Sequence, residues 1–340
     1  KRQHLLIAIP PHAQKDISQI CGKFIADRGL AGGDKGQLPD ILRPDIIVGC
    51  QRAVPGHQKT PGIGGGKADI TLQLDPTVLP DKKEGYVLDA TSGKIVIKAN
   101  SPAGILNGVQ TLRQVIKEKD GKLMVQKATV ADYPAFSWRA FMLDEGRYFK
   151  GKEVVKQLLD EMADLKMNVF HWHLTDDQGW RIEIKKYPKL TEIGSKREKT
   201  LVDYYYVNYP QVFDGKEHGG YYTQEQIKDV VAYAASKYIN VVPEIEMPGH
   251  ALAALAAYPE LSCDSTQTYK VSPTWGVFEQ VFCPSETTFK FFEGVMDEVI
   301  ELLPSEYIHI GGDECPKTAW KNSAFCQQLI RQLGLKDDTT

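Results

Sequence analysis

Residues 168–178 read NVFHWHLTDDQ, and this stretch decides the fold class of the chain. Its first seven residues form a short strand-like run, and Thr175, Asp176 and Asp177 follow at once. A short, nearly continuous apolar strand is typical of a parallel sheet that helices cover on both faces. Polar side chains placed directly after such a strand lie at its carboxyl end, where α/β proteins build their sites.

The same arrangement occurs three more times in the second part of the chain. The strand-like runs cover residues 138–143, 168–174, 239–245 and 307–311. Helical patterns alternate with them over residues 152–165, 223–238, 287–303 and 319–333. Acids follow each run, and four consecutive strands that deliver acids at their carboxyl ends predict the mouth of a (β/α)₈ TIM barrel. An open sheet would instead gather these acids at one switch point.

The first part of the chain has a different pattern. Alternating apolar and polar residues at 68–74 and 94–98 predict half-buried strands, and Ser101-Pro102 begins a helix that runs through Val115. We therefore expect an α/β protein with a small α+β domain over residues 1–131. Residues 132–340 are then the N-terminal half of a barrel, with about its first four βα units. Since four strands leave an open edge, we expect the remaining half from further sequence.

Composition excludes several classes of partner. The 340 residues carry 41 Lys plus Arg against 44 Asp plus Glu, a formal charge of −3. Nucleic acids and acidic membrane surfaces require clustered positive charge, so we expect neither as a partner. The longest apolar runs are far shorter than the ~18 residues of a membrane helix, so we also expect no membrane span.

The six cysteines leave two possibilities open. The chain has no Cys-x-x-Cys and no Cys/His cluster with zinc spacing, which argues against a structural metal site. In an oxidising compartment, a disulfide could join Cys263 to Cys283 or Cys315 to Cys326. The alternative is that all six are free thiols packed within the fold.

Residues 307–314, YIHIGGDE, carry the most chemical information. An apolar strand runs into two glycines and then into adjacent carboxylates. Neighbouring residues on an extended chain point in different directions, so Asp313 and Glu314 are not interchangeable catalysts of one step. One can protonate a leaving group while the other holds something else. The alternative is a solvated acidic pair at the start of the helix that follows.

A pair of histidines raises a second possibility, a metal-dependent hydrolase. His171 and His173 point to the same side of their strand, as two metal ligands would, and acids follow them. Such chemistry needs further ligands from later strands, and His250 is the one other histidine well placed for it. We therefore expect no metal.

The complete set of motifs resembles that of the family 20 glycoside hydrolases, the β-N-acetylhexosaminidases. The similar segments are 104–112 (GILNGVQTL), 132–139 (DYPAFSWR), 143–149 (LDEGRYF), 168–181 (NVFHWHLTDDQGWR), 243–250 (PEIEMPGH) and 309–314 (HIGGDE). They span nearly the whole chain in the family's order. Ala140 departs from the family, in which many members have glycine.

The resemblance implies a substrate-assisted mechanism without a cofactor. Glu314 corresponds to the general acid, and Asp313 to the residue that orients the substrate's acetamido group. Arg139 corresponds to a residue that binds hydroxyls of the terminal sugar. The polar residues implied around the acid pair are Asp176, Glu244 and His250.

The implied activity is exo-hydrolysis of terminal, non-reducing β-linked GlcNAc or GalNAc from an oligosaccharide or glycoconjugate, through an oxazolinium intermediate. Two rival functions are a non-hydrolytic amino-sugar-binding protein of the same fold and a metal-dependent amidohydrolase. Exo-enzymes of this kind are often exported, so we expect a periplasmic or secreted protein. A Cys263–Cys283 disulfide would suit that compartment.

Overall fold

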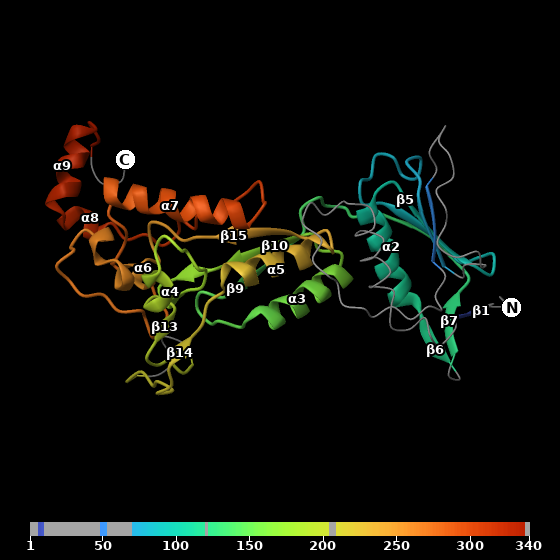
Figure 1. Cartoon of the computed structure of the whole chain (residues 1–340), viewed down its shortest axis with the longest axis horizontal. Helices are drawn as coiled ribbons and strands as arrows, with labels where there is room; N and C mark the ends of the chain where they lie inside the picture. The colour runs from blue at the N-terminus through green and yellow to red at the C-terminus, as the bar shows by residue number, and fades with distance from the viewer. Residues whose placement is uncertain (1–5, 10–47, 53–69, 120–121, 204–208, 337–340) are drawn as a thin grey trace. The chain divides into compact units, whose positions relative to one another are not determined.

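A computed structural model of the chain shows two compact units (Figure 1). The structure describes residues 6–9, 48–52, 70–119, 122–203 and 209–336. The first unit contains the described residues up to Arg139, together with 160–168 and 235–239. The second contains residues 140–159, 169–234 and the described residues from 240 onward.

A mixed five-stranded sheet forms the centre of the first unit. Its order is β2 (Val48–Arg52), β3 (Ile70–Leu74), β5 (Ile95–Ala99), β4 (Tyr86–Asp89) and β8 (Thr129–Asp132). The first three strands are parallel, and β4 is antiparallel to both of its neighbours. Alternate residues of β4 and β5 are buried, which confirms the half-buried pattern predicted for residues 94–98.

Helix α2 (Pro102–Val115) covers this sheet. It begins where predicted, because the Ser101 side chain accepts a hydrogen bond from the Gly104 backbone N–H and caps the first turn. Ile105, Val109 and Leu112 share one core with the strands. A second sheet, of three strands, has the order β1 (Leu6–Ile9), β7 (Lys122–Gln126) and β6 (Lys117–Lys119).

Parallel strands form the centre of the second unit, in the order β15 (Asn240–Glu244), β10 (Val169–His173) and β9 (Ala140–Asp144). The predicted run at 307–311 lies parallel beside β15 but pairs with it through a single bridge, Glu244 to His309. Backbone hydrogen bonds from Ile245 to the His309 carbonyl and from Met247 to the Ile310 carbonyl hold it there. All four runs therefore point their carboxyl ends the same way.

Helices separate these strands. They are α3 (Lys152–Asp164), α5 (Gln224–Ala235) and α7 (Glu286–Leu302). The connection after β10 contains β11 (Thr175–Asp176), β12 (Gly179–Trp180), α4 (Lys189–Glu192), β13 (Lys196–Arg197) and β14 (His218–Gly219). The connection after β15 contains α6 (Leu252–Ala257) and the short 3₁₀ helix η2 (Pro259–Leu261). No helix among the described residues is long and apolar enough to cross a membrane.

The single helix predicted over 319–333 is wrong. The structure has two helices there, α8 (Thr318–Asn322) and α9 (Ala324–Gln332). Ser323 separates them because its backbone is extended and its hydroxyl accepts a hydrogen bond from the Cys326 N–H. A serine in that position ends one helix and caps the next.

Candidate active site

The strand register of the second unit assembles one row of polar residues. His173 on β10 lies directly opposite Asp144 on β9 and Glu244 on β15, and Glu244 lies opposite His309. Residues opposite each other in parallel strands point to the same face. Four segments far apart in the chain therefore deliver ionisable side chains to one face at the carboxyl ends of the strands.

Glu244 joins the histidines of this face. One of its oxygens, Oε2, lies 2.8 Å from His171 Nε2, and the other, Oε1, lies 2.7 Å from His309 Nδ1. Burial alone would raise the pKa of Glu244, but the His171 hydrogen bond and the charges of His173, His171 and His309 lower it to about 2. Glu244 therefore stays ionised and orients the two imidazoles.

Asp176 is a fully buried carboxylate held by three cationic or ionisable partners. Its Oδ2 lies 2.8 Å from Arg147 Nη1 and 3.2 Å from His173 Nε2, and its Oδ1 lies 3.3 Å from His250 Nδ1. Burial opposes its ionisation, but these partners outweigh burial and lower the pKa of Asp176 below its usual range.

His250 connects this buried network to the end of the fourth strand. Its Nδ1 contacts Asp177 Oδ2 at 3.0 Å, and the same aspartate accepts the Leu252 N–H through Oδ1. Hydrogen bonds to Asp176 and Asp177 raise the pKa of His250 to about 11, against the effect of burial. The imidazole is therefore protonated at neutral pH, and its Nε2 faces the acid pair.

The adjacent acids Asp313 and Glu314 are the exposed members of the site. Their side chains are 64% and 53% exposed, and their nearest oxygens lie 3.8 and 3.6 Å from His250 Nε2. The backbone of Glu314 has a positive φ of 43°, which is rare for a residue with a side chain. Such strain is often found at functional sites. The pair is thus accessible to solvent, and the buried imidazolium of His250 contacts both carboxylates.

The two glycines before the acids differ in what they do. Gly311 has φ of 67°, and a Cβ there would lie 1.6 Å from Glu246 Oε2, so a side chain would displace that carboxylate and strain the backbone. Gly312 has φ of 95° with open space around it. Gly311 therefore allows close approach of the backbone to the Glu246 carboxylate.

Glu246 and Arg147 are site residues that the sequence analysis did not single out. Burial raises the pKa of Glu246 to about 8, and the charges of Glu244 and Asp176 add to this effect. Arg147 pairs with Asp144 at 3.3 Å as well as with Asp176, and its side chain is about one third exposed. Each follows a strand, Arg147 as one of the charged residues after β9 and Glu246 after β15. That position was the signal by which both could have been found.

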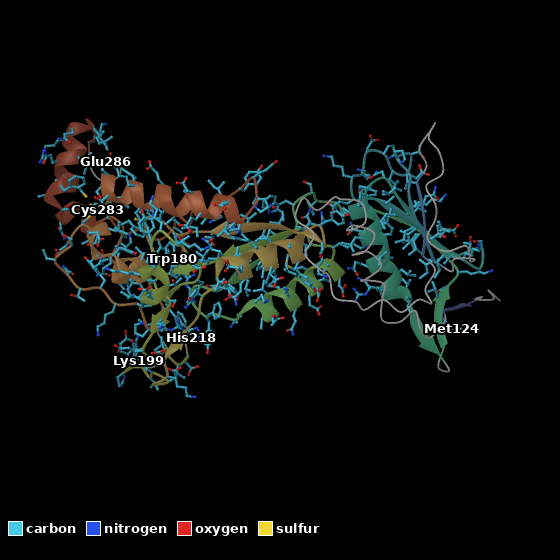
Figure 2. The ribbon with its side chains drawn as sticks, in the orientation of Figure 1. Met124, Trp180, Lys199, His218, Cys283 and Glu286 are labelled. Carbon is cyan, nitrogen blue, oxygen red and sulfur yellow. The ribbon has the colours of Figure 1, made fainter. Side chains whose placement is uncertain are left out.

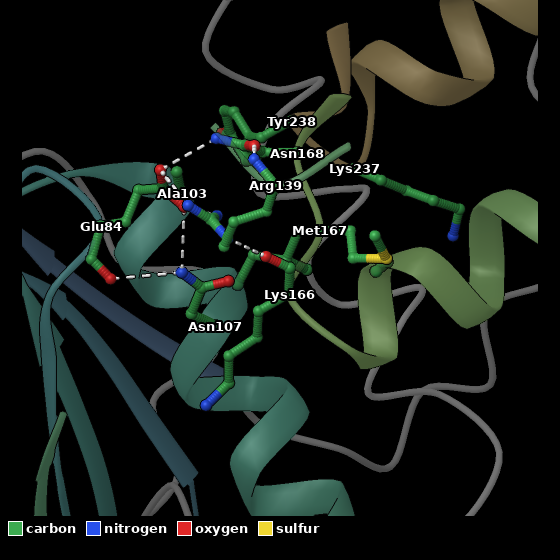
Figure 3. Close-up of a pocket in the computed structure, with 11 residues that line it drawn as sticks. Glu84, Ala103, Asn107, Arg139, Lys166, Met167, Asn168, Lys237 and Tyr238 are labelled. Carbon is green, nitrogen blue, oxygen red and sulfur yellow. Dashed lines mark hydrogen bonds and ion pairs between the residues drawn. The ribbon is translucent and has the colours of Figure 1, made fainter. Parts of the chain in front are cut away.

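Arg139 lies elsewhere, and its predicted role in binding sugar hydroxyls is wrong. It precedes β9 at the strand's amino end, whereas the acids follow the carboxyl ends. Its guanidinium forms an ion pair with Glu84 and donates to the backbone carbonyl of Lys166 (Figure 3). It also donates to the backbone carbonyl of Phe136. The adjoining cavity has a volume of about 10 Å³, enough for roughly one water molecule and too small for a sugar.

The Arg181 side chain holds the loops around the site through hydrogen bonds to their backbone. It is fully buried and donates five hydrogen bonds to backbone carbonyls, those of Glu145, Gly146, Gln178, Ser195 and Gly220. These carbonyls belong to the loops after β9 and β10. The neighbouring Trp180, labelled in Figure 2, is also buried. One side chain therefore fixes two loops that carry site residues.

Several sets of side chains in the site could ligate a metal ion. In the set His171, Glu244 and His309, and in the set His173, Asp176 and Glu246, the ligand atoms lie within 4.8 Å of one another. Hydrogen bonds and ion pairs within the first set account for the positions of its members. His173 and Asp176 are paired in the same way.

The structure forms neither of the two disulfides that the sequence left possible. Cys263, Cys283, Cys315 and Cys326 are free thiols in it, in agreement with the alternative for these four. Cys326, proposed as a partner of Cys315, lies instead beside Cys263 and Cys283. The first turn of α9 carries it there, away from Cys315.

Chemically, the site combines an accessible pair of carboxylates with a protonated imidazole and an arginine. One acid of the pair can donate a proton, and the other points in a different direction. The guanidinium of Arg147 can donate hydrogen bonds to hydroxyl oxygens. These parts suit proton transfer to a leaving group on a polyhydroxylated substrate.

Two family descriptions match the chain. "Glycosyl hydrolase family 20, catalytic domain" matches residues 136–340, and "Glycosyl hydrolase family 20, domain 2" matches residues 50–133. The domain boundary that we placed between residues 131 and 132 stays a prediction.

Named relatives are similar over most of the chain. A beta-hexosaminidase of Porphyromonas gingivalis is 46% identical over 293 residues, which are 80% of this chain and 36% of that protein. A beta-N-acetylhexosaminidase structure from Bacteroides fragilis is 39% identical with a TM-score of 0.67, over 80% of this chain and 50% of that one.

A further solved structure is an exo beta-N-acetylglucosaminidase from Vibrio harveyi in complex with N-acetylglucosamine. It is 34% identical with a TM-score of 0.69, over 80% of this chain and 42% of that one. The first three curated relatives that match are covered over 36%, 44% and 53% of their own length. The chain therefore spans about a third to a half of the proteins it resembles.

Proposed function

The chain belongs to glycosyl hydrolase family 20, and from this membership we propose that the protein is an exo-acting β-N-acetylhexosaminidase. It removes terminal, non-reducing β-linked GlcNAc or GalNAc with retention at C1. The adjacent acids Asp313 and Glu314 above the buried His250 carry the proposal, since they supply two carboxylates with different directions at one point. Relatives named as a beta-hexosaminidase and an exo beta-N-acetylglucosaminidase agree with this activity.

Glu314 protonates the glycosidic oxygen and later activates water. The nucleophile is the carbonyl oxygen of the substrate's own 2-acetamido group, which closes on C1 and forms an oxazolinium ion. Holding this nucleophile within the substrate gives it a high effective concentration. No enzyme carboxylate attacks the sugar, and no cofactor takes part.

Asp313 orients the acetamido N–H and stabilises the positive charge that develops on the ring. The adjacency of the acids fits this division, because the leaving oxygen and the acetamido group lie at different places on one sugar ring. The buried His250, anchored by Asp176 and Asp177, contacts both acids through its Nε2 and fixes the base of the pair.

Arg147 takes the role that the sequence analysis assigned to Arg139. It lies beyond the carboxyl end of β9, on the same side as the acids, and two aspartates fix its guanidinium. Its donors that do not contact these aspartates form a fork suited to neighbouring hydroxyls of a sugar.

The test uses the full-length protein with chromogenic aryl β-glycosides of GlcNAc, GalNAc and glucose, each with and without a chelator. We expect turnover of the two acetamido sugars, little turnover of the glucoside, and no effect of the chelator on turnover at a temperature where the protein stays folded. Efficient hydrolysis of the glucoside, or a sugar trapped covalently on a carboxylate, would contradict the mechanism. Binding of GlcNAc without turnover would favour a sugar-binding protein, and loss of activity with the chelator while the protein stays folded would favour a metal-dependent hydrolase.

We also propose that the protein is exported to the periplasm or secreted, where it would meet glycans of other organisms. Fractionation of the producing cells, with activity and antibody detection, tests this location. Recovery of the protein only in the cytosol would contradict it.

A further inference from the structure

Three cysteines from distant parts of the chain meet in the second unit. Cys263 follows η2, and Cys326 lies in the first turn of α9. Cys283, labelled in Figure 2, precedes α7. The Sγ atom of Cys326 lies 3.6 Å from that of Cys263 and 3.9 Å from that of Cys283. All three sulfur atoms lie within 4.8 Å of one another.

These separations suit a shared metal ion better than a covalent bond. A disulfide requires ~2.05 Å between sulfur atoms, and it joins only two of three cysteines. Two thiolates that bind one zinc ion at ~2.3 Å and at the tetrahedral angle lie ~3.7–3.8 Å apart. The distances of 3.6 and 3.9 Å lie on either side of that value.

The backbone around the cluster holds the three cysteines in place. Ser262 and Phe282 form an antiparallel bridge, and the Cys283 N–H donates to the Leu261 carbonyl at 2.8 Å. The Trp320 indole on α8 donates to the Phe282 carbonyl at 2.9 Å, which ties the third segment to the first two. Such a preorganised framework is typical of structural metal sites.

The exposure of the three cysteines and the position of α9 also suit a bound ion. Cys283 and Cys326 are 5% and 3% exposed, whereas Cys263 is partly exposed and leaves an entry path. Cys326 lies at the amino end of α9, where the aligned backbone dipoles stabilise negative charge.

We propose that Cys263, Cys283 and Cys326 together bind one zinc ion, with the fourth position open to water beside Cys263. Binding releases the three S–H protons to solvent and leaves zinc and sulfur in their oxidation states. The ion would join the connection after β15 to the segment that follows Glu314. It is a structural clamp, separate from the catalytic step and independent of the proposed activity.

Zinc content of the full-length protein tests the site, after purification with reductant and without chelator. We expect one more zinc per chain in the wild type than in Cys326→Ser or Cys283→Ser. Cys315→Ser is the matched control, because this free thiol lies outside the cluster, and we expect it to keep the ion. Substitution by Co²⁺ should give a thiolate-to-cobalt charge-transfer band that Cys326→Ser lacks.

Thermal unfolding supplies a second measurement. A chelator should lower the Tm of the wild type by at least ~5 °C and leave the Tm of Cys326→Ser unchanged. A disulfide between two cluster cysteines in non-reducing peptide mapping, or equal zinc in wild type and Cys326→Ser, would overturn the proposal. Failure of the reduced protein to take up Zn²⁺ or Co²⁺ would also overturn it.

Discussion

Two regions of the molecule bury charged side chains. In one region all the charges are paired with one another, and in the other some acids remain accessible. In the Arg139 cluster, formed by Arg139, Glu84, Asn107 and Asn168, hydrogen bonds link every charged group to a partner within the first unit. At the carboxyl ends of β9, β10 and β15, acids outnumber their cationic partners. Two of those acids, Asp313 and Glu314, remain largely exposed.

The difference separates a structural network from a functional one. The Arg139 cluster encloses a cavity of about 10 Å³, so its charges serve one another. The site after the strands has perturbed groups instead, including Glu246 with a pKa raised to about 8 and His250 with a pKa raised to about 11. Perturbed ionisable groups beside accessible carboxylates are typical of an active site.

The strongest test of this comparison is the acid pair. Glu314→Gln removes the proton donor, so substrates with poor leaving groups should lose ~10²–10⁴-fold in kcat while activated aryl glycosides keep more activity. Asp313→Asn should slow both substrate types together by ~10²–10⁴-fold, because positioning and charge stabilisation are lost. Steady-state kinetics on both substrate types measures this split. Equal losses for the two variants on every substrate would contradict the separate roles.

The two arginines test the comparison directly. Arg147→Met should reduce kcat/KM by roughly 10²-fold, since it removes charged hydrogen bonds to a substrate. Arg139→Met should instead lower stability by about 1–3 kcal/mol, because Glu84 loses its partner, with kcat/KM of the folded protein retained. Kinetics and urea unfolding of both variants distinguish them. The reverse pattern would restore the role that the sequence analysis gave to Arg139.

Substitution of the two glycines before the acids should lower the free energy of unfolding by different amounts. Gly311→Ala places a methyl group against the Glu246 carboxylate and strains the backbone, so we expect a loss of roughly 2–5 kcal/mol. Gly312→Ala meets open space and should cost only the strain, about 1–2 kcal/mol. Urea unfolding of the two variants measures the difference. Similar losses would show that Glu246 does not constrain Gly311.

Glu246 gives a smaller, pH-dependent effect. Its pKa is about 8 in the folded protein and 4.5 ordinarily, so the folded state loses stability as pH rises between these values. His173, Glu244, Asp176 and His250 surround it. Glu246→Gln should therefore stabilise the protein relative to wild type at pH 9 but not at pH 4.5, as measured by urea unfolding. A difference that does not vary with pH would contradict the raised pKa.

Local patterns predicted much of the fold. The predicted helix starting at Ser101-Pro102, and those at 152–165, 223–238 and 287–303, agree with α2, α3, α5 and α7 to within a few residues at most ends. Ser101 caps α2 where the sequence predicts a helix start, and Ser285 caps α7 in the same way. The break at Ser323 was missed because a serine inside an amphipathic pattern looks like a surface position until its hydroxyl meets a backbone N–H.

The candidate site was predicted unevenly. Asp176, Glu244, His250, Asp313 and Glu314 come together as expected, since each lies at or beyond the carboxyl end of one of the parallel runs. Arg139 was misplaced because a motif shared with a family does not say at which end of the strand its arginine lies. Arg147, three residues beyond the end of the same strand, lies at the functional end.

The sequence by itself determined the class of fold, the edge of the sheet that carries chemistry and the acids that lie there. Apolar runs, turns and caps are local, and the direction of a parallel strand determines where its following residues lie. Only the tertiary structure decided which charges pair. The contacts of His250 with Asp177, of Arg139 with Glu84, and of Cys326 with Cys263 and Cys283 join residues far apart in the chain. Pairing at these separations depends on packing between elements, which no spacing within the sequence encodes.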